Sequence, residues 1–247
     1  MISRGLKMNG TPVEVIREDL VYRYRMNDRQ HQIEHIDTVW ENAKNILLED
    51  IVSGYAESVY GKIDDRLILL LWTAVYYHDI MVWKDRKNHH TLAGEYILND
   101  KKLNNEFNRD ELMMIYHAVV NHRASESFPS INYSYLTEVV RTADRGKPTL
   151  EAIIIRSNIL GMQPNEETFK LLEHLVIKYG PDGYTYENDV YYKNRFKKEI
   201  SKLEKDMVKL YKSLTSEWIS DESINTNLLM SCMDKINKHL IRKGVEL

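Results

Sequence analysis

The sequence predicts an all-α protein. Apolar residues recur at intervals of three and four along most of the chain, as on a helix face, whereas the alternating pattern of a half-buried strand is scarce. Only five prolines and ten glycines interrupt the 247 residues, and we find neither an internal repeat nor a low-complexity tract. A chain of this length can form one domain with an extension or two small domains, with a sizeable core.

Turn-rich segments divide the chain into expected helices. The clearest is 179–184, Tyr-Gly-Pro-Asp-Gly-Tyr, so we expect a first domain over 1–178 and a C-terminal helical extension over 179–247. Within the first domain, breaks between helices are expected at 53–65, 82–88, 99–110, 123–133 and 145–149.

The first of these helices carries a histidine on its apolar face. That face is formed by His35, Val39, Ala43 and Ile46, at intervals of four, four and three. His35 is therefore expected to point into the core.

The second helix ends in a polar pair. Its apolar run of 11 residues, 67–77, is followed directly by His78-Asp79. Burying an ionised Asp79 is very costly unless a cation or strong hydrogen-bond donors compensate for its charge. The run is also too short to cross a bilayer, so no membrane span is expected.

Two histidines compete for a site position in the third helix. His90 shares a face with Gly94 and Ile97 and has this small residue one turn further on, so we favour it. His89, on the face of Ala93, is the alternative.

In the fourth helix His117 and His122 are five residues apart, about 140° around a helix, so both cannot face one site. We favour His122, which lies with Ile115 and Ala118, over His117. In the fifth helix Asp144 follows apolar residues four and eight positions earlier, so it too is a polar residue on an apolar stripe.

A metal centre explains these inward polar residues together. A core would need a separate hydrogen-bonding partner for each of them, whereas one centre satisfies them all. Imidazole and carboxylate ligands suit divalent Mn, Fe, Co, Ni or Zn, with one or two ions per chain. The predicted ligands are His35, His78, Asp79, His90, His122 and Asp144, with His89 and His117 as alternatives.

The ordered set of segments resembles the HD-domain superfamily of metal-dependent phosphohydrolases, over about residues 28 to 147. The segments that carry the resemblance are 28–39, His78-Asp79, 90–98, 118–122 and 139–144. Two positions depart from the family. Thr38 stands where relatives often have Arg, and no Glu-Asp follows His78-Asp79 as in hydrolases of the guanosine tetraphosphate alarmone.

The resemblance implies an HD-type helical bundle and an enzyme that hydrolyses a phosphoester or phosphoanhydride of a nucleotide with a metal-activated water. It implies that Asp79 bridges two ions, and His31, one turn before His35, could exchange a proton. Cyclic dinucleotides, cyclic mononucleotides, and nucleoside triphosphates and monophosphates are all open as substrates. The alternatives are a mixed-valence di-iron oxygenase of the same fold and a non-catalytic nucleotide-binding module.

Cations near these segments are expected to bind the substrate's phosphates, although each of them can also be an ordinary solvated side chain. The candidates are Lys84, Arg123, Arg145 and Lys147, with Arg86 and Lys87 in the loop that holds Lys84. The net charge of −3 gives no general attraction to nucleic acid, so we expect no stable nucleic-acid partner.

The remaining features favour a cytoplasmic protein without a membrane partner. Cys232 is the single cysteine, which excludes an intramolecular disulfide and suits a reducing compartment. Residues 1–10 lack an apolar core of signal-peptide length.

The C-terminal extension contains a narrow apolar seam. It is formed by Phe196, Ile200, Leu203, Met207, Leu210 and Leu214, at intervals of three and four over about two and a half heptads. This is short for a coiled coil, so we expect the seam to pack back onto the catalytic domain, with a homodimer contact as the alternative.

Overall fold

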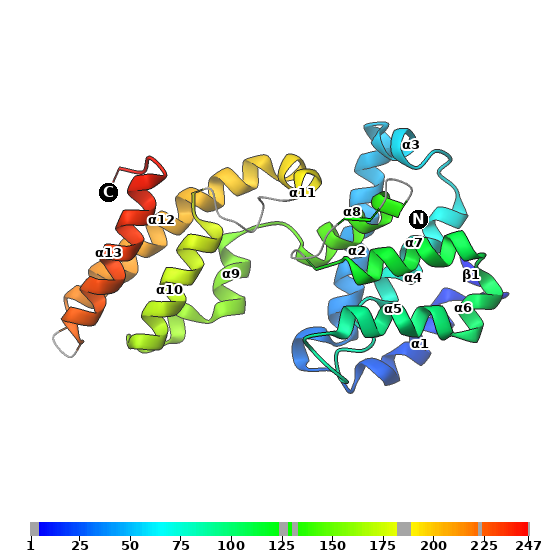
Figure 1. The fold of residues 1–247 in the computed structure, drawn as a ribbon, viewed down its shortest axis with the longest axis horizontal. Coiled ribbons are helices and arrows are strands. Elements are labelled where there is room, and N and C mark those ends of the chain that lie inside the picture. The colour runs from blue at the N-terminus through cyan, green and yellow to red at the C-terminus, as the bar shows by residue number, and fades with distance from the viewer. Residues whose placement is uncertain (1–4, 124–127, 130–132, 182–188, 222–223, 247) are drawn as a thin grey trace. The chain divides into compact units, whose positions relative to one another are not determined.

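The computed structural model confirms the all-α prediction. It describes residues 5–123, 128–129, 133–181, 189–221 and 224–246, and within them thirteen α-helices and one two-stranded sheet (Figure 1). The chain divides into two compact units, Met1–Gly146 and Lys147–Leu247. No helix among these residues combines the length and the apolar character that a membrane crossing requires.

The first unit begins with a hairpin and continues with helices (blue to green in Figure 1). Its elements are β1 (Lys7–Met8), β2 (Thr11–Pro12), α1 (Val13–Tyr24), the 3-10 helix η1 (Arg29–His31), α2 (Ile33–Val52), α3 (Tyr55–Val59), α4 (Asp65–Tyr77), α5 (His89–Asn99), α6 (Lys101–Glu106), α7 (Arg109–Val120) and α8 (Ser134–Arg145). The short helices α3 and α6 fall inside two of the expected breaks. In the hairpin Lys7 pairs with Pro12 and Met8 with Thr11.

Helix α4 is the centre of the first unit. Asp64 caps its beginning by accepting hydrogen bonds from two backbone N–H groups of the first turn. Every residue from Leu69 to Tyr77 is buried, and α4 packs against α2, α7 and α8. A helix that is apolar all round is stable only when other helices surround it. The residues that follow Tyr77 therefore begin deep in the unit.

Helices α5 and α7 pack closely at Gly94. A Cβ atom at this position would lie 2.5 Å from Val120 Cγ2 and 2.8 Å from Tyr116 Cε2. The small residue one turn after His90 thus permits close contact between two helices.

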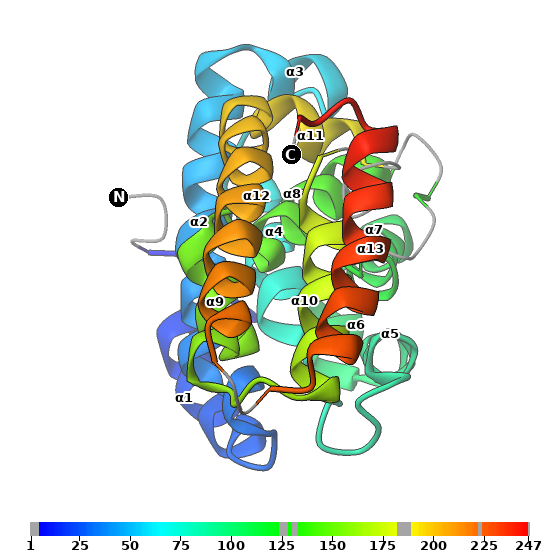
Figure 2. The same ribbon diagram turned by 90° about the vertical axis from the view of Figure 1, so that its left-hand side faces the viewer.

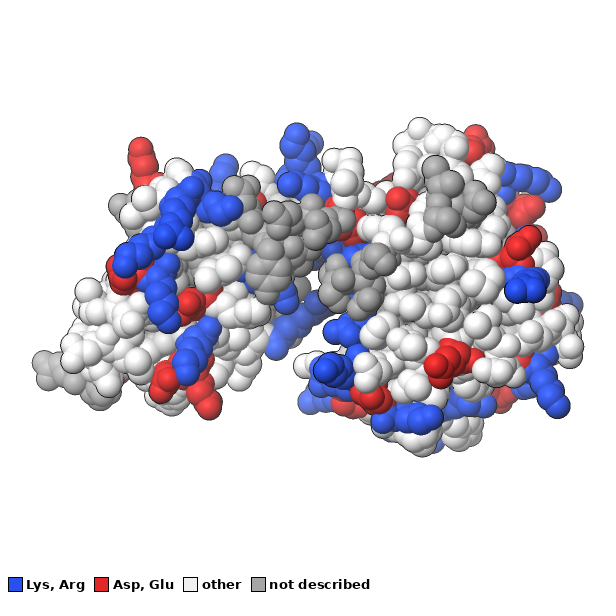
Figure 3. All heavy atoms as spheres, in the orientation of Figure 1, with Lys and Arg blue, Asp and Glu red and all other residues white. Residues whose placement is uncertain are grey.

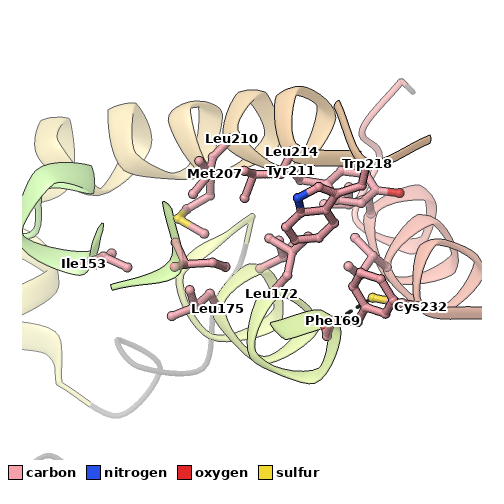
Figure 4. Close-up of a cluster of buried hydrophobic side chains, with 14 of the residues drawn as sticks. Ile153, Phe169, Leu172, Leu175, Met207, Leu210, Tyr211, Leu214, Trp218 and Cys232 are labelled. Atoms are coloured by element: carbon pink, nitrogen blue, oxygen red, sulfur yellow. Dashed lines mark hydrogen bonds between the residues drawn. The ribbon is translucent and has the colours of Figure 1, made fainter. Parts of the chain in front are cut away.

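The second unit consists of α9 (Leu150–Ser157), η3 (Ile159–Gly161), α10 (Glu166–Tyr179), α11 (Val190–Arg195), α12 (Lys197–Ile219) and α13 (Thr226–Arg242). Helices α10, α12 and α13 run side by side (Figure 2). Their buried side chains form one core, in which Met207, Leu210 and Leu214 of α12 face Leu172 of α10 (Figure 4).

This core corrects the expected domain boundary. The break between the units falls at 146/147 rather than at 178/179, because α9 and α10 bury their apolar faces against α12 and α13. The apolar seam of α12 is buried from Ile200 to Leu214 against α9, α10 and α13, so it packs on residues 150–178 of the expected first domain, which share its unit. The turn that suggested the earlier boundary lies partly outside the described residues.

The close contact at Gly94 predicts the effect of a methyl group. Overpacking costs about 1–3 kcal/mol, whereas replacing a helical Gly by Ala gains at most about 1 kcal/mol. Gly94→Ala should therefore lower the free energy of unfolding by about 1 kcal/mol, measured by urea denaturation. Thr91→Ala, at an exposed position of the same helix, should not lower it, and equal stability of Gly94→Ala and the wild type would contradict the packing.

Candidate functional site

His78 and Asp79 lie at the C-terminal end of α4, where the helix leaves them inside the unit. His78 is fully buried and Asp79 is 2% exposed. Three other helices surround α4, so residues from several segments can reach this point.

Both carboxylate oxygens of Asp79 face imidazole nitrogens. Asp79 Oδ1 lies 3.1 Å from His89 Nε2 and 3.7 Å from His122 Nε2. Asp79 Oδ2 lies 3.2 Å from His78 Nε2 and 3.7 Å from His35 Nε2. The carboxylate thus stands between two pairs of histidines.

A second carboxylate lies beside His35 and His78, one of the two histidine pairs. Asp144 Oδ1, from the last turn of α8, lies 3.1 Å from His35 Nε2 and 3.8 Å from His78 Nε2. Ligand atoms of His35, His78 and Asp144 all lie within 4.8 Å of one another, as do those of His78, Asp79 and His122. Each group has the size of a metal-binding site.

Three of the histidines are held in one tautomer. Nδ1 of His78, His122 and His89 lies 2.7, 2.7 and 2.8 Å, respectively, from the backbone carbonyl oxygen three residues earlier. A carbonyl only accepts hydrogen bonds, so each Nδ1 carries the hydrogen and each Nε2 of a neutral ring presents a lone pair. This arrangement is typical of histidines that bind metal through Nε2.

The donor set fits a cation. Nε2 of His89 and Nε2 of His122 are 3.3 Å apart, and two lone pairs at this distance repel unless a positive charge lies between them. The buried Nε2 of His78 has no hydrogen-bond partner among the described residues. Four imidazoles and two carboxylates could therefore hold one or two divalent ions.

The pKa values show what burial does to this cluster. Burial lowers the pKa of His122 to about 4, so its ring is neutral near pH 7. Burial opposes ionisation of Asp79, but the imidazoles of His78 and His89 outweigh it and hold the carboxyl's pKa well below its ordinary range. Burial likewise disfavours a charged His78, yet the neighbouring carboxylates raise its pKa well above the usual value. The carboxylates thus attract positive charge into the cluster.

The structure reverses the choice between His89 and His90. His89 Nε2 contacts Asp79, and the His89 ring lies 5.2 Å from that of His122, compared with 6.5 Å for the His90 ring. The prediction of His90 rests on Gly94, but this small residue serves the contact with α7. His90 is also buried, beside His89 at the start of α5.

His122 lies in the cluster and His117 lies apart from it. The His117 ring stacks on Tyr133, with centroids 5.0 Å apart. Helix α7 ends at Val120, so His122 reaches the site from the turn that follows rather than from the expected helix face. Its Nδ1 bond to Val119 O turns the ring inward.

His31 lies beside the cluster. Its ring centroid is 6.0 Å from that of His35 and 6.5 Å from that of His89. His31 Nδ1 is 2.7 Å from Asp28 Oδ1. His31 is thus adjacent to both histidine pairs, and the carboxylate of Asp28 orients its ring.

The predicted phosphate-binding cations differ in their surroundings. Arg123 donates to the carbonyl of Lys87, and Arg145 donates to that of Arg141. Lys147 belongs to the second unit, where it pairs with Glu199 at 2.9 Å.

Lys84 lines a separate cavity with Tyr96 and Glu95 of α5. Figure 3 shows Lys and Arg side chains gathered at the end of the first unit that holds the loop between α4 and α5. Arg123 contacts this loop just before the beginning of α5, because it donates a hydrogen bond to Lys87 O.

Asn27 is a site residue that the sequence did not reveal. Its Nδ2 donates to the carbonyl oxygens of His31 and Asp79, at 2.9 and 3.0 Å, and its Oδ1 accepts from Trp83 N at 2.9 Å. It therefore ties η1, the His78-Asp79 segment and the following loop together. A lone asparagine in a loop carries no pattern that predicts this role.

Comparison of the chain with protein-family models, with curated proteins and with solved structures found no match in any of the three. The chemistry of the cluster is therefore the basis for inferring a function.

The bonds of Asn27 predict a large effect of its loss. Asn27→Leu removes the partner of His31 O and of Trp83 N, at about 1–3 kcal/mol for each, and should lower the free energy of unfolding by roughly 3 kcal/mol in urea denaturation. Asn104→Leu is the matched control, because the Asn104 amide also bonds two carbonyl oxygens but in exposed surroundings. Its cost should stay below about 1 kcal/mol. Equal costs for the two variants would contradict the role of Asn27.

Proposed function

We propose that this chain is a metal-dependent phosphohydrolase of the HD type that hydrolyses a phosphoester or phosphoanhydride bond of a nucleotide. The observation that carries the proposal is the position of Asp79, whose two oxygens face different histidine pairs. A carboxylate in this position can hold two ions side by side.

Two unequal subsites follow from the contacts. The first would be formed by His35, His78, Asp144 and Asp79 Oδ2, and the second by His89, His122 and Asp79 Oδ1. The second has fewer protein donors and leaves more room for water or substrate. The mixed nitrogen and oxygen donors favour Mn, Fe, Co, Ni or Zn over Mg or Ca, which prefer oxygen alone.

The protein's own residues supply orientation and proton transfer. When bound, the ions lower the pKa of a coordinated water and draw charge from the phosphoryl oxygens. The Nδ1 bonds of His78, His89 and His122 fix the direction of their Nε2 atoms. His31, beside the cluster, can take up at Nε2 the proton that the attacking water gives up.

The cations near the site favour an anionic substrate. Arg86 belongs to the loop between α4 and α5, which leads to His89. Arg123 contacts this loop through Lys87 O. Guanidinium groups bind phosphate oxygens through charge-assisted hydrogen bonds. This feature favours phosphate chemistry over the oxygenase alternative.

A substrate panel tests the proposed function. The full chain, loaded separately with Mn, Co, Ni or Fe(II), should release phosphate, pyrophosphate or a monophosphate from at least one member of a panel of nucleoside triphosphates, monophosphates and cyclic nucleotides. Asp79→Asn should abolish this turnover and reduce bound metal, measured by elemental analysis, because both subsites share Asp79. Asp65→Asn, at an exposed position of α4, is the control and should change neither. Oxygen uptake by the Fe(II) protein without turnover of any nucleotide would instead favour the oxygenase.

The two neighbouring histidines of α5 provide a direct test of the second subsite. His89→Ala should lose about one bound ion per chain, because it removes one of the two imidazoles that face Asp79 Oδ1. His90→Ala should keep the wild-type metal content. Elemental analysis of both variants after dialysis measures the bound metal. Loss of metal from His90→Ala alone would show that His90, as the sequence predicts, is the ligand.

A further inference from the structure

His31 differs from His78, His89 and His122 in what holds its ring. Nδ1 of His78, His89 and His122 donates to neutral backbone carbonyls, whereas Nδ1 of His31 is 2.7 Å from the carboxylate oxygen of Asp28. A carboxylate and a carbonyl both select the Nδ1–H tautomer. The carboxylate also stabilises the imidazolium that forms when Nε2 takes up a proton, as the aspartate of a Ser-His-Asp triad does.

The surroundings of His31 suit proton transfer better than metal binding. Its side chain is 20% exposed, whereas those of His78 and His122 are almost fully buried. Its ring is 6.0 Å from that of His35 and 6.5 Å from that of His89. His31 therefore adjoins both proposed subsites and also reaches solvent.

Asp28 is itself fixed from several directions. Its Oδ1 accepts a hydrogen bond from Gln30 N at 2.9 Å, and its Oδ2 lies 3.5 Å from Arg86 Nη1. Arg86 Nη2 in turn donates to Gln30 Oε1 at 3.2 Å. Although partial burial opposes ionisation, the bond to His31 and the charge of Arg86 keep the pKa of Asp28 below its ordinary value. The carboxylate is thus ionised and aligned with His31 Nδ1.

The backbone of this segment is anchored to the metal-binding segment. Asn27 Nδ2 bonds the carbonyl oxygens of both His31 and Asp79. The distance from η1 to the end of α4 is therefore set by one buried amide, and Asp28 sets the orientation of the His31 ring on this fixed base.

We propose that Asp28 is a positioning residue that holds His31 in the Nδ1–H tautomer and directs Nε2 toward the substrate at the metal site. The catalytic part of this inference rests on the proposed function, because it assigns His31 to the proton transfer of that hydrolysis. The tautomer and its dependence on Asp28 do not rest on it.

The first arm of the test measures the tautomer. The full chain is labelled with 15N-histidine and loaded with diamagnetic Zn²⁺, and the His31 signals are assigned with His31→Gln. In the wild type, Nδ1 should give the shift of a protonated and Nε2 that of an unprotonated ring nitrogen. Asp28→Asn preserves size and helix capping but removes the charge and can donate to Nδ1, so the His31 signals should move toward a mixture of tautomers. Asp19→Asn, exposed on α1, should leave them unchanged.

The second arm measures whether Asp28 acts through His31. With Mn²⁺ and bis(p-nitrophenyl) phosphate as probe, Asp28→Asn should lower kcat about tenfold to a hundredfold, since general acid–base catalysis contributes about 10²–10⁴-fold. KM and metal content should change little. His31→Gln should lower kcat at least as much, and the double variant should be no slower than His31→Gln alone.

The two arms separate the possible failures. An unchanged single tautomer in Asp28→Asn overturns the positioning role whatever the activity. Losses that multiply in the double variant overturn it as well, because Asp28 would then act independently of His31. A wild-type protein that turns over neither the probe nor any nucleotide contradicts the proposed function, while the NMR arm still decides the tautomer.

Discussion

A carboxylate buried at the end of an apolar helix is the constraint on which the first unit depends. The free-energy cost of burying an ionised Asp79 is large unless donors or cations surround it. The unit satisfies this need with imidazoles from α2, α5, the end of α4 and the turn after α7. The packing of these helices around α4 therefore determines the position of each histidine as well as the apolar core.

Local backbone geometry turns this packing into a defined site. His78, His89 and His122 lie at or just beyond helix ends, and each bonds through Nδ1 to a carbonyl three residues earlier. The C-terminal end of a helix leaves backbone carbonyls without intrahelical partners, so the imidazoles of His78 and His122 can bond there. His89, the first residue of α5, bonds instead to Arg86 O in the preceding loop. A helix interior offers fewer such carbonyls. At these positions each ring bonds a backbone carbonyl through Nδ1 and keeps Nε2 available to the cluster.

Much of this could be predicted from the sequence, where periodicity is strong. The apolar stripe containing His35 and the run before His78-Asp79 both indicated inward-facing polar groups, and the structure brings these residues together. Periodicity does not define the first turn of a helix, where His89 and His90 are both buried, and it is Nε2 of His89 that contacts Asp79.

The unit boundary was also misplaced. Helices α9 and α10 look alike in composition to those before them, and only their contacts with later helices assign them to the second unit. Asn27 acts through a single side chain, which leaves no repeating signal in a sequence.

The spacing of the cluster along the chain affects how the protein matures. Its members come from segments between residues 35 and 144, so an unfolded chain offers isolated ligands instead of a site. An ion that binds only the native arrangement stabilises it by an amount that grows with the logarithm of its free concentration above Kd, and chelation removes this stabilisation. Under the proposed function, the cellular supply of metal would therefore change the fraction of unfolded molecules that proteases can attack.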